Sequence, residues 1–171
     1  MSGTIVVADS GPIIHLSRVG LLDVLPALYG RIVVPRAVFN EVVNDGAGQP
    51  GSAELARAAW TEIADHDERD PLFAGFLQIL QIGESAAISI AHQRSAGLFL
   101  CDDNHARMTA KSSGLSVKGT LGLLVLAKQR GHIDAVAPKI RSLRSQSVWM
   151  SSEIIRRTLH EAGEKDADID G

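Results

Sequence analysis

Five carboxylates lie inside or directly beside apolar segments of this chain: Asp9, Glu41, Glu84, Asp102 and Asp103. An isolated ionised carboxylate loses its hydration when it is buried, and this loss is costly. Several carboxylates that converge can share a divalent cation, which offsets both the desolvation and their mutual repulsion. The residue types and their apolar surroundings therefore predict a metal site.

The elements that position these acids follow from apolar runs of strand length that alternate with helical stretches. We expect strands over residues 4–8, 31–34, 61–64, 98–101 and 115–117. Helices are expected over residues 11–18, 21–29, 35–44, 52–60, 71–81, 84–96, 104–113, 121–130, 133–145 and 152–162. This alternation is typical of an α/β fold whose mainly parallel sheet is flanked by helices on both faces.

In such a sheet, the ligand crevice lies beyond the carboxyl ends of the strands. Asp9 and the pair Asp102-Asp103 each follow a predicted strand. Glu41 falls in the second turn of the helix after the strand 31–34, and Glu84 opens a helix on its apolar stripe. We therefore expect the acids to meet in one crevice.

Each acid also has a structural explanation that involves no metal. Asp9 and the acidic pair could cap the helices that follow them, and Glu84 could gain from the helix dipole. Glu41 is flanked by valines and has no capping role, so it is the hardest to explain in this way.

Three hydroxyl or amide residues near the acids could contact phosphate or a water molecule on the metal: Ser10, Asn104 and Thr120. Each is equally suited to capping a helix. His105 lacks the paired Cys/His spacing of a zinc site, and His15 lies between Ile14 and Leu16 as a packed histidine would.

The sequence contains no nucleophile elbow, Walker loop or dinucleotide fingerprint. A phosphoacceptor domain would carry its acidic pair on the first strand, where this chain has only Asp9.

Composition and charge bound the remaining possibilities. A length of 171 residues with 45% hydrophobic residues suits one domain. Residues 94–157 contain 11 Lys or Arg against 4 Asp or Glu, whereas residues 1–93 contain 5 against 11. The basic segment could follow a phosphate backbone, or it could consist of solvated helix faces. The low aromatic content of 4% argues against an RNA-recognition surface on which bases stack on successive aromatic side chains.

The chain shows no feature of a secreted or membrane protein. The first apolar run is too short for a signal peptide, and residues 121–127 are too few to span a bilayer. The single cysteine, Cys101, allows no intrachain disulfide. We expect a cytoplasmic protein that does not bind membranes.

Five stretches in the same order resemble the PIN-domain nucleases, in particular a VapC-like toxin branch often described only as a domain of unknown function. They are VVADSGPII from Val6, VPRAVFNEV from Val34, GESAAI from Gly83, DDNHAR from Asp102 and GTLGLL from Gly119. Together they place the resemblance over residues 4–160.

This resemblance implies a three-layer PIN-like domain over residues 1–163, including helices at about 133–162, with an acidic disordered tail at 164–171. It implies a metal-dependent endoribonuclease, the toxin of a toxin–antitoxin pair, with RNA as substrate and a small antitoxin protein as partner. Asp9, Glu41, Glu84 and the acidic pair would hold Mg²⁺ or Mn²⁺, ions that prefer hard oxygen ligands. The apolar positions of the terminal helices allow a homodimer.

One position departs from the pattern of this branch. A second acid usually follows the first shortly after in the Gly-Glu motif, and Ala86 occupies that place here. The alternative function is therefore a catalytically weak PIN-like module that binds RNA or protein. Because neighbouring residues on an extended chain diverge in direction, one of Asp102 and Asp103 is expected to bind the ion directly and the other through water.

Overall fold

The computed structural model of the chain describes residues 3–166. Within this range, five parallel strands form one sheet in the order β3-β2-β1-β4-β5. The strands are β1 (Val6–Ala8), β2 (Ile32–Pro35), β3 (Thr61–Ala64), β4 (Leu98–Leu100) and β5 (Val117–Lys118). The predicted α/β fold with a parallel central sheet is confirmed.

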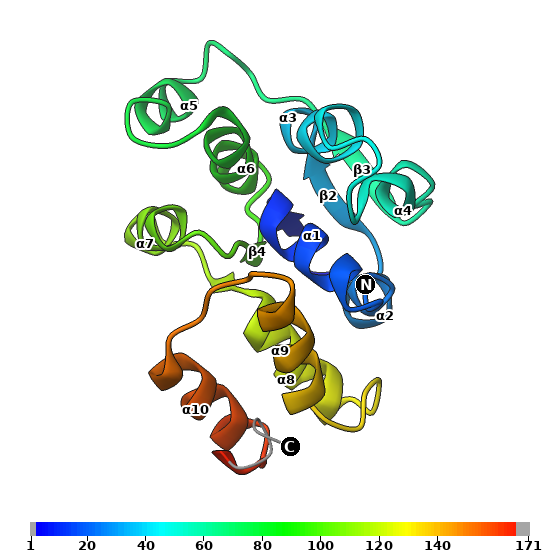
Figure 1. The fold of residues 1–171 in the computed structure, drawn as a ribbon. Helices are drawn as coiled ribbons and strands as arrows, with labels where there is room; N and C mark the ends of the chain where they lie inside the picture. The colour runs from blue at the N-terminus through cyan, green and yellow to red at the C-terminus, as the bar shows by residue number, and fades with distance from the viewer. Residues whose placement is uncertain (1–2, 167–171) are drawn as a thin grey trace.

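Helices flank both faces of this sheet (Figure 1). They are α1 (Ser10–Arg18), α2 (Val24–Tyr29), α3 (Arg36–Phe39), the π-helix η1 (Asn40–Asp45), α4 (Ser52–Ala56), α5 (Pro71–Phe76), α6 (Ile82–Gln93), α7 (Asn104–Ser112), α8 (Thr120–Gln129), α9 (Ala137–Ser145) and α10 (Ser152–Glu161).

Strand alternation divides the core between the two faces. Val6 and Ala8 of β1 belong to the cluster that contains buried residues of α1, α8, α9 and α10. Val7, which points the other way, belongs to the cluster formed by α6 and α7. Because successive side chains of a strand point to opposite faces, a short β-branched run can fill both cores.

The order of the strands reverses at β1, which pairs with β2 on one side and β4 on the other. Ala8 is in register with Leu100, and the Asp9 N–H donates to the Leu100 carbonyl at 2.9 Å. The crevice at such a reversal is the usual ligand site of an open α/β sheet. The residues that follow β1 and β4 therefore leave the sheet side by side.

Several predicted helices are shorter or different in the structure. The helix expected over residues 35–44 is α3 followed by η1, and Pro35 is the last residue of β2 instead of the first of the helix. The helix expected over 52–60 ends at Ala56, and the carbonyl of Trp60 instead accepts a hydrogen bond from Ile32 N–H at the start of the sheet. The helix expected over 71–81 ends at Phe76 and continues as turns.

Residue 164, where the acidic tail was predicted to begin, is still packed against the domain. The Glu164 side chain is only 8% exposed and accepts hydrogen bonds from Lys128 Nζ and from the backbone N–H groups of Val136 and Ala137. It therefore satisfies donors at the start of α9 that would otherwise lack partners. Residues 167–171 of the predicted tail lie outside the described residues.

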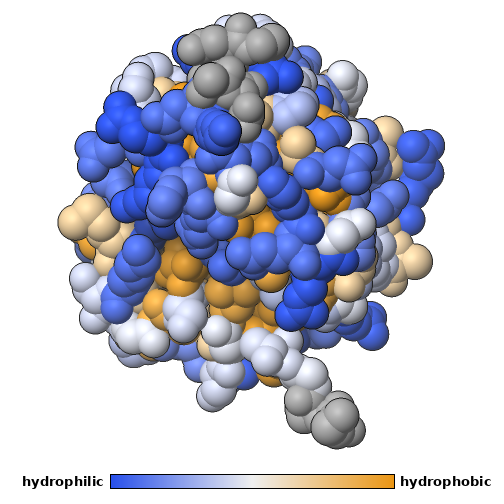
Figure 2. Space-filling model, turned by 90° about the horizontal axis from the view of Figure 1, so that it is seen from below, coloured by the Kyte–Doolittle hydropathy of each residue, from blue (hydrophilic) through white to orange (hydrophobic). Residues whose placement is uncertain are grey.

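The surface at the end of the molecule near α10 is mainly hydrophilic around a group of apolar residues (Figure 2). On α10, Ile155 and Leu159 are buried within the chain, whereas Ile154 is 39% exposed. Most apolar side chains of this helix therefore pack within the chain itself, and a homodimer stays a prediction. In the part of the chain that the structure describes, no helix is long and apolar enough to cross a bilayer.

Candidate active site

Asp9 lies at the carboxyl end of β1 and is 5% exposed. It occupies the N-cap position of α1, yet within residues 3–166 its side chain makes no capping hydrogen bond. Burial raises its pKa to about 7; the backbone N–H of Ser10 opposes this rise, and the negative charges of Glu84 and Glu41 add to it. The capping explanation for Asp9 is therefore wrong, and the site holds a carboxylate whose charge is poorly compensated.

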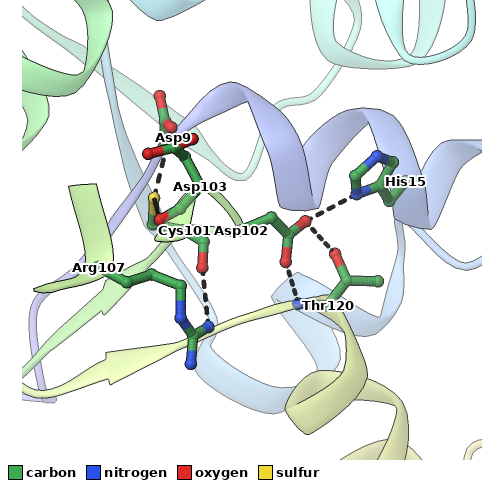
Figure 3. Close-up of polar contacts among 7 residues, drawn as sticks. All are labelled: Asp9, His15, Cys101, Asp102, Asp103, Arg107 and Thr120. Carbon is green, nitrogen blue, oxygen red and sulfur yellow. Dashed lines mark hydrogen bonds and ion pairs between the residues drawn. The ribbon is translucent and has the colours of Figure 1, made fainter. Parts of the chain in front are cut away.

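Cys101, the residue after β4, lies against this carboxylate. Its Sγ donates to Asp9 Oδ2 at 3.6 Å (Figure 3). Burial raises the pKa of the thiol, and the charge of Asp9 raises it further, so the sulfur keeps its proton and acts as a donor. This contact was not predictable from the sequence, because an apolar strand end is also where an ordinary buried cysteine is found.

Glu41 reaches the start of α1 from the π-helix η1. Ser10 Oγ donates to Glu41 Oε1 at 3.0 Å, so the predicted neighbour Ser10 contacts one of the acids. The wider helical turn is closed by Gly46 N–H, which donates to the Glu41 carbonyl five residues back at 2.9 Å. Single π-type turns are frequent at functional sites. Glu41 itself is exposed and can change its rotamer.

Gly83 allows the first turn of α6 to approach both of these acids. A Cβ atom at this position would lie 3.2 Å from Glu41 Oε2 and 4.0 Å from Asp9 Oδ1. The first of these distances is tighter than an ordinary van der Waals contact. A glycine here therefore leaves open the space between Asp9 and Glu41.

Glu84 begins α6 beside this space. Its Oε2 accepts from Gln81 N–H at 3.1 Å, so its predicted role at a helix start is present. Burial raises its pKa, the N–H of Gln81 opposes this, and repulsion from Asp103 and Glu41 raises it further. The nearby His105 lowers it. These interactions place Glu84 among the acids, although helix capping occupies one of its oxygens.

The acidic pair divides between two environments. Asp103 caps α7, since its Oδ1 accepts from Ala106 N–H at 2.8 Å, and its charge acts on Glu84. Asp102 turns away from Asp9 toward His15 and Thr120 (Figure 3). Asp9, Glu41, Glu84 and Asp103 therefore form one group, which we call the carboxylate cluster, and Asp102 stands outside it.

The other predicted neighbours fall in different places. Thr120 contacts Asp102, and it is the first residue of α8 while Gly119 is the N-cap, so its predicted capping role is wrong. Asn104 Nδ2 lies 3.7 Å from Met108 Sδ on the exposed side of α7. His15, expected as a packed residue, contacts the carboxylate of Asp102 at 2.7 Å. No local sequence signal indicated this contact, because Asp102 lies 87 residues further along the chain.

The donor set of the carboxylate cluster fits a hard divalent cation. Its members are oxygen ligands, and Asp9 buries a charge that lacks a cationic partner among the contacts found for it. In their present rotamers, however, no three Asp, Glu, His or Cys side chains within residues 3–166 are gathered closely enough to hold an ion. Glu41 and Glu84 are engaged with Ser10 and Gln81 instead.

Position 86, where an acid was expected, lies on the inner side of α6. Ala86 is fully buried, as are its neighbours Ala87 and Ile88. Glu84 is therefore the carboxylate that this helix contributes to the cluster.

The comparison with known proteins extends over nearly the whole fold. A family model described as a PIN domain matches residues 5–164, which include the carboxylate cluster and every strand of the sheet. A search of the curated proteins finds no match. The resemblance seen in the sequence motifs is confirmed: the chain belongs to the PIN-domain family, whose members are generally nucleases.

Proposed function

We propose that this PIN domain is a divalent-metal-dependent endoribonuclease that hydrolyses RNA phosphodiester bonds. The observation that carries the proposal is the carboxylate cluster at the point where the strand order reverses, with the buried Asp9 at its centre. Family membership supports nuclease chemistry in general, whereas RNA as the substrate rests on the resemblance to the VapC-like branch.

Mg²⁺ or Mn²⁺ would be held by Asp9, Glu41, Glu84 and Asp103. The ion would supply positive charge at the attacking and leaving oxygens of the scissile phosphate. Asp9 is the fixed member of the set, because the backbone bond to β4 and the thiol of Cys101 hold it in place. Ser10 orients Glu41 through its hydroxyl.

The basic segment over residues 94–157 would bind the substrate backbone. It carries an excess of seven positive charges, whereas the cluster itself is strongly negative and would repel a polyanion. Arg107, whose Nη1 donates to the Cys101 carbonyl at 3.0 Å, brings one of these charges close to the end of β4.

Cleavage of a mixed RNA by the purified chain with Mn²⁺ tests the proposal. We expect cleavage by the wild type and a loss of at least a hundredfold in Asp9→Asn and Glu41→Gln. Asp23→Asn changes the exposed acid before α2 and Glu54→Gln an exposed acid of α4, and both variants should cleave as the wild type does. Equal cleavage by all five proteins would refute the assigned roles.

The alternative is a PIN-like module that binds RNA or protein but cleaves poorly. Ala86 favours it, because α6 brings one acid to the cluster where the related branch usually has two. RNA binding detected by calorimetry, without cleavage in Mg²⁺ or Mn²⁺, would support this second function over the first.

We further propose that the chain acts in the cytoplasm as the toxin of a VapBC-like pair, with a small antitoxin protein as its partner. Expression of the wild type should then arrest growth, and Asp9→Asn should not. Coexpression of a small protein encoded by a neighbouring gene should restore growth and copurify with the chain. Growth arrest that Asp9→Asn also causes would contradict the toxin proposal.

A further inference from the structure

Hydrogen-bond donors of the protein surround the side chain of Asp102. In the described part of the chain it accepts three hydrogen bonds: from His15 Nδ1 at 2.7 Å, Thr120 Oγ1 at 2.5 Å and Thr120 N–H at 2.7 Å. A carboxylate offers about four acceptor positions, so little capacity is left for a cation.

Two glycines make room for this carboxylate. A Cβ atom at Gly11 would lie 3.1 Å from the Cβ of Asp102, and one at Gly119 would lie 2.9 Å from Asp102 Oδ1. Gly11 belongs to the first turn of α1, and Gly119 is the N-cap of α8. Asp102 is therefore enclosed between the beginnings of two helices.

Its hydrogen bonds connect these helices to the end of β4. Gly119 has no side chain with which to cap α8, and Asp102 accepts the Thr120 N–H in its place. His15 connects the same carboxylate to α1, the helix that begins directly after Asp9 and carries Ser10.

We infer that Asp102 is a positioning residue and that Asp103 is the cation ligand of the pair. Through His15 and Thr120, Asp102 fixes α1 and α8 against the end of β4. This clamp holds Asp9 and the Ser10–Glu41 contact at a set distance from Asp103. The inference rests on the proposed metal site for the role of Asp103, whereas the clamp itself does not need a metal.

Amide hydrogen exchange of the metal-free protein tests the clamp. Asp102→Asn and Thr120→Val should speed exchange at least tenfold in the first turns of α1 and α8. Thr120→Ser, which keeps the hydroxyl, should behave as the wild type. Asp103→Asn should act on the start of α7 instead, because Asp103 caps that helix. Unchanged exchange at α1 and α8 in Asp102→Asn and Thr120→Val would overturn the clamp.

Mn²⁺ binding, measured by calorimetry on the same variants, separates a positioning residue from a ligand. Asp103→Asn should weaken binding at least tenfold. Asp102→Asn should weaken it by a smaller factor, and Thr120→Val, which removes one of the three hydrogen bonds that Asp102 accepts, should weaken it less. The double variant should bind as Asp102→Asn does, since both changes act on the same carboxylate. A loss in Asp102→Asn as large as in Asp103→Asn, with Thr120→Val unaffected, would make Asp102 a ligand.

The two measurements fail independently. If the wild type binds no Mn²⁺, the proposed metal site is refuted, while hydrogen exchange still decides whether Asp102 clamps α1 and α8.

Discussion

Among the acids of the site, Asp9 is the one whose ionisation costs the folded chain the most free energy, because it is buried. It is buried, faces two other carboxylates and has a pKa of about 7 against an ordinary 3.8. Between these pH values the folded chain binds more protons than the unfolded chain, so stability falls as the pH rises through this window. The full effect is on the order of 4 kcal/mol when a pKa unit is converted to free energy.

Asp9→Asn should remove this pH dependence in the absence of divalent cations. We expect the variant to be more stable than the wild type at pH 8 by a few kcal/mol, and similar to it at pH 4, where the wild-type carboxyl is protonated. Urea denaturation in EDTA at both pH values measures the difference. Asp23→Asn, at an exposed acid, should keep the wild-type pH slope. A slope that Asp9→Asn leaves intact would show that Asp9 is not the group responsible.

Gly83→Ala should separate cation binding from stability. The added methyl group would press on Glu41 Oε2, an exposed side chain that can move aside, and alanine favours the helix. We expect an unchanged or slightly higher Tm and Mn²⁺ affinity reduced several-fold by calorimetry. Gly75→Ala in α5, where a Cβ meets nothing within 4 Å, is the matched control and should not change the affinity. An affinity equal to that of the wild type would remove Gly83 from the site.

At the scale of single residues, the sequence predicted that five acids would meet, whereas the structure groups four of them and places Asp102 with His15 and Thr120. Asp9, Glu41, Glu84 and Asp103 were predictable because strand ends and apolar helix stripes have fixed directions. The separate role of Asp102 was not predictable. It depends on Gly119 and Thr120, which lie 17 or more residues further along the chain and reach Asp102 only in the folded structure. Cys101 was hidden because its contact with Asp9 spans two strands.

Among the elements, the π-helix η1 is the one that the hydrophobic pattern did not predict. Residues 35–44 show an apolar stripe that suits an α-helix, and the stripe alone cannot distinguish closure at four residues from closure at five. The distinction is made at Gly46, where the chain passes close to the carbonyl of Val42. The strands were predicted to within one or two residues. The apolar runs of β1 and β2 are buried on both faces, whereas β3 and β5 are mostly half-buried.

Gly46→Ala should disturb η1 and, through it, Glu41. A Cβ atom there would lie 2.7 Å from the Val42 carbonyl oxygen, and a backbone atom cannot move aside as a side chain can. We expect a loss of about 1–3 kcal/mol in the free energy of unfolding, as for other backbone clashes. Urea denaturation measures it, and calorimetry should show weaker Mn²⁺ binding. A stability equal to that of the wild type would mean that η1 has room to adjust.

Across the whole molecule, the charge is divided between an acidic N-terminal half and a basic segment over residues 94–157. If this segment binds RNA, the affinity must fall as salt rises, because bound phosphates release their counterions. We expect a loss on the order of tenfold or more between 50 and 200 mM KCl. Fluorescence anisotropy of a labelled single-stranded RNA with Asp9→Asn measures this without cleavage.

Two charge-reversal variants test which part of the chain binds the RNA. Lys111→Glu, at an exposed position of α7, should weaken RNA binding, whereas Arg57→Glu in the acidic half should not. Affinity that does not depend on salt, or that falls equally in both variants, would contradict a phosphate path along the basic segment.

The position of β1 at the centre of the sheet also has a consequence for synthesis of the chain. The first strand needs β4 as a neighbour, and the cluster needs Asp103, which is made 94 residues after Asp9. A nascent chain that ends before this point has Asp9, Glu41 and Glu84 but lacks Asp103, the N-cap of α7. On the ribosome, surrounded by RNA, the protein therefore cannot assemble its carboxylates until Asp103 has emerged.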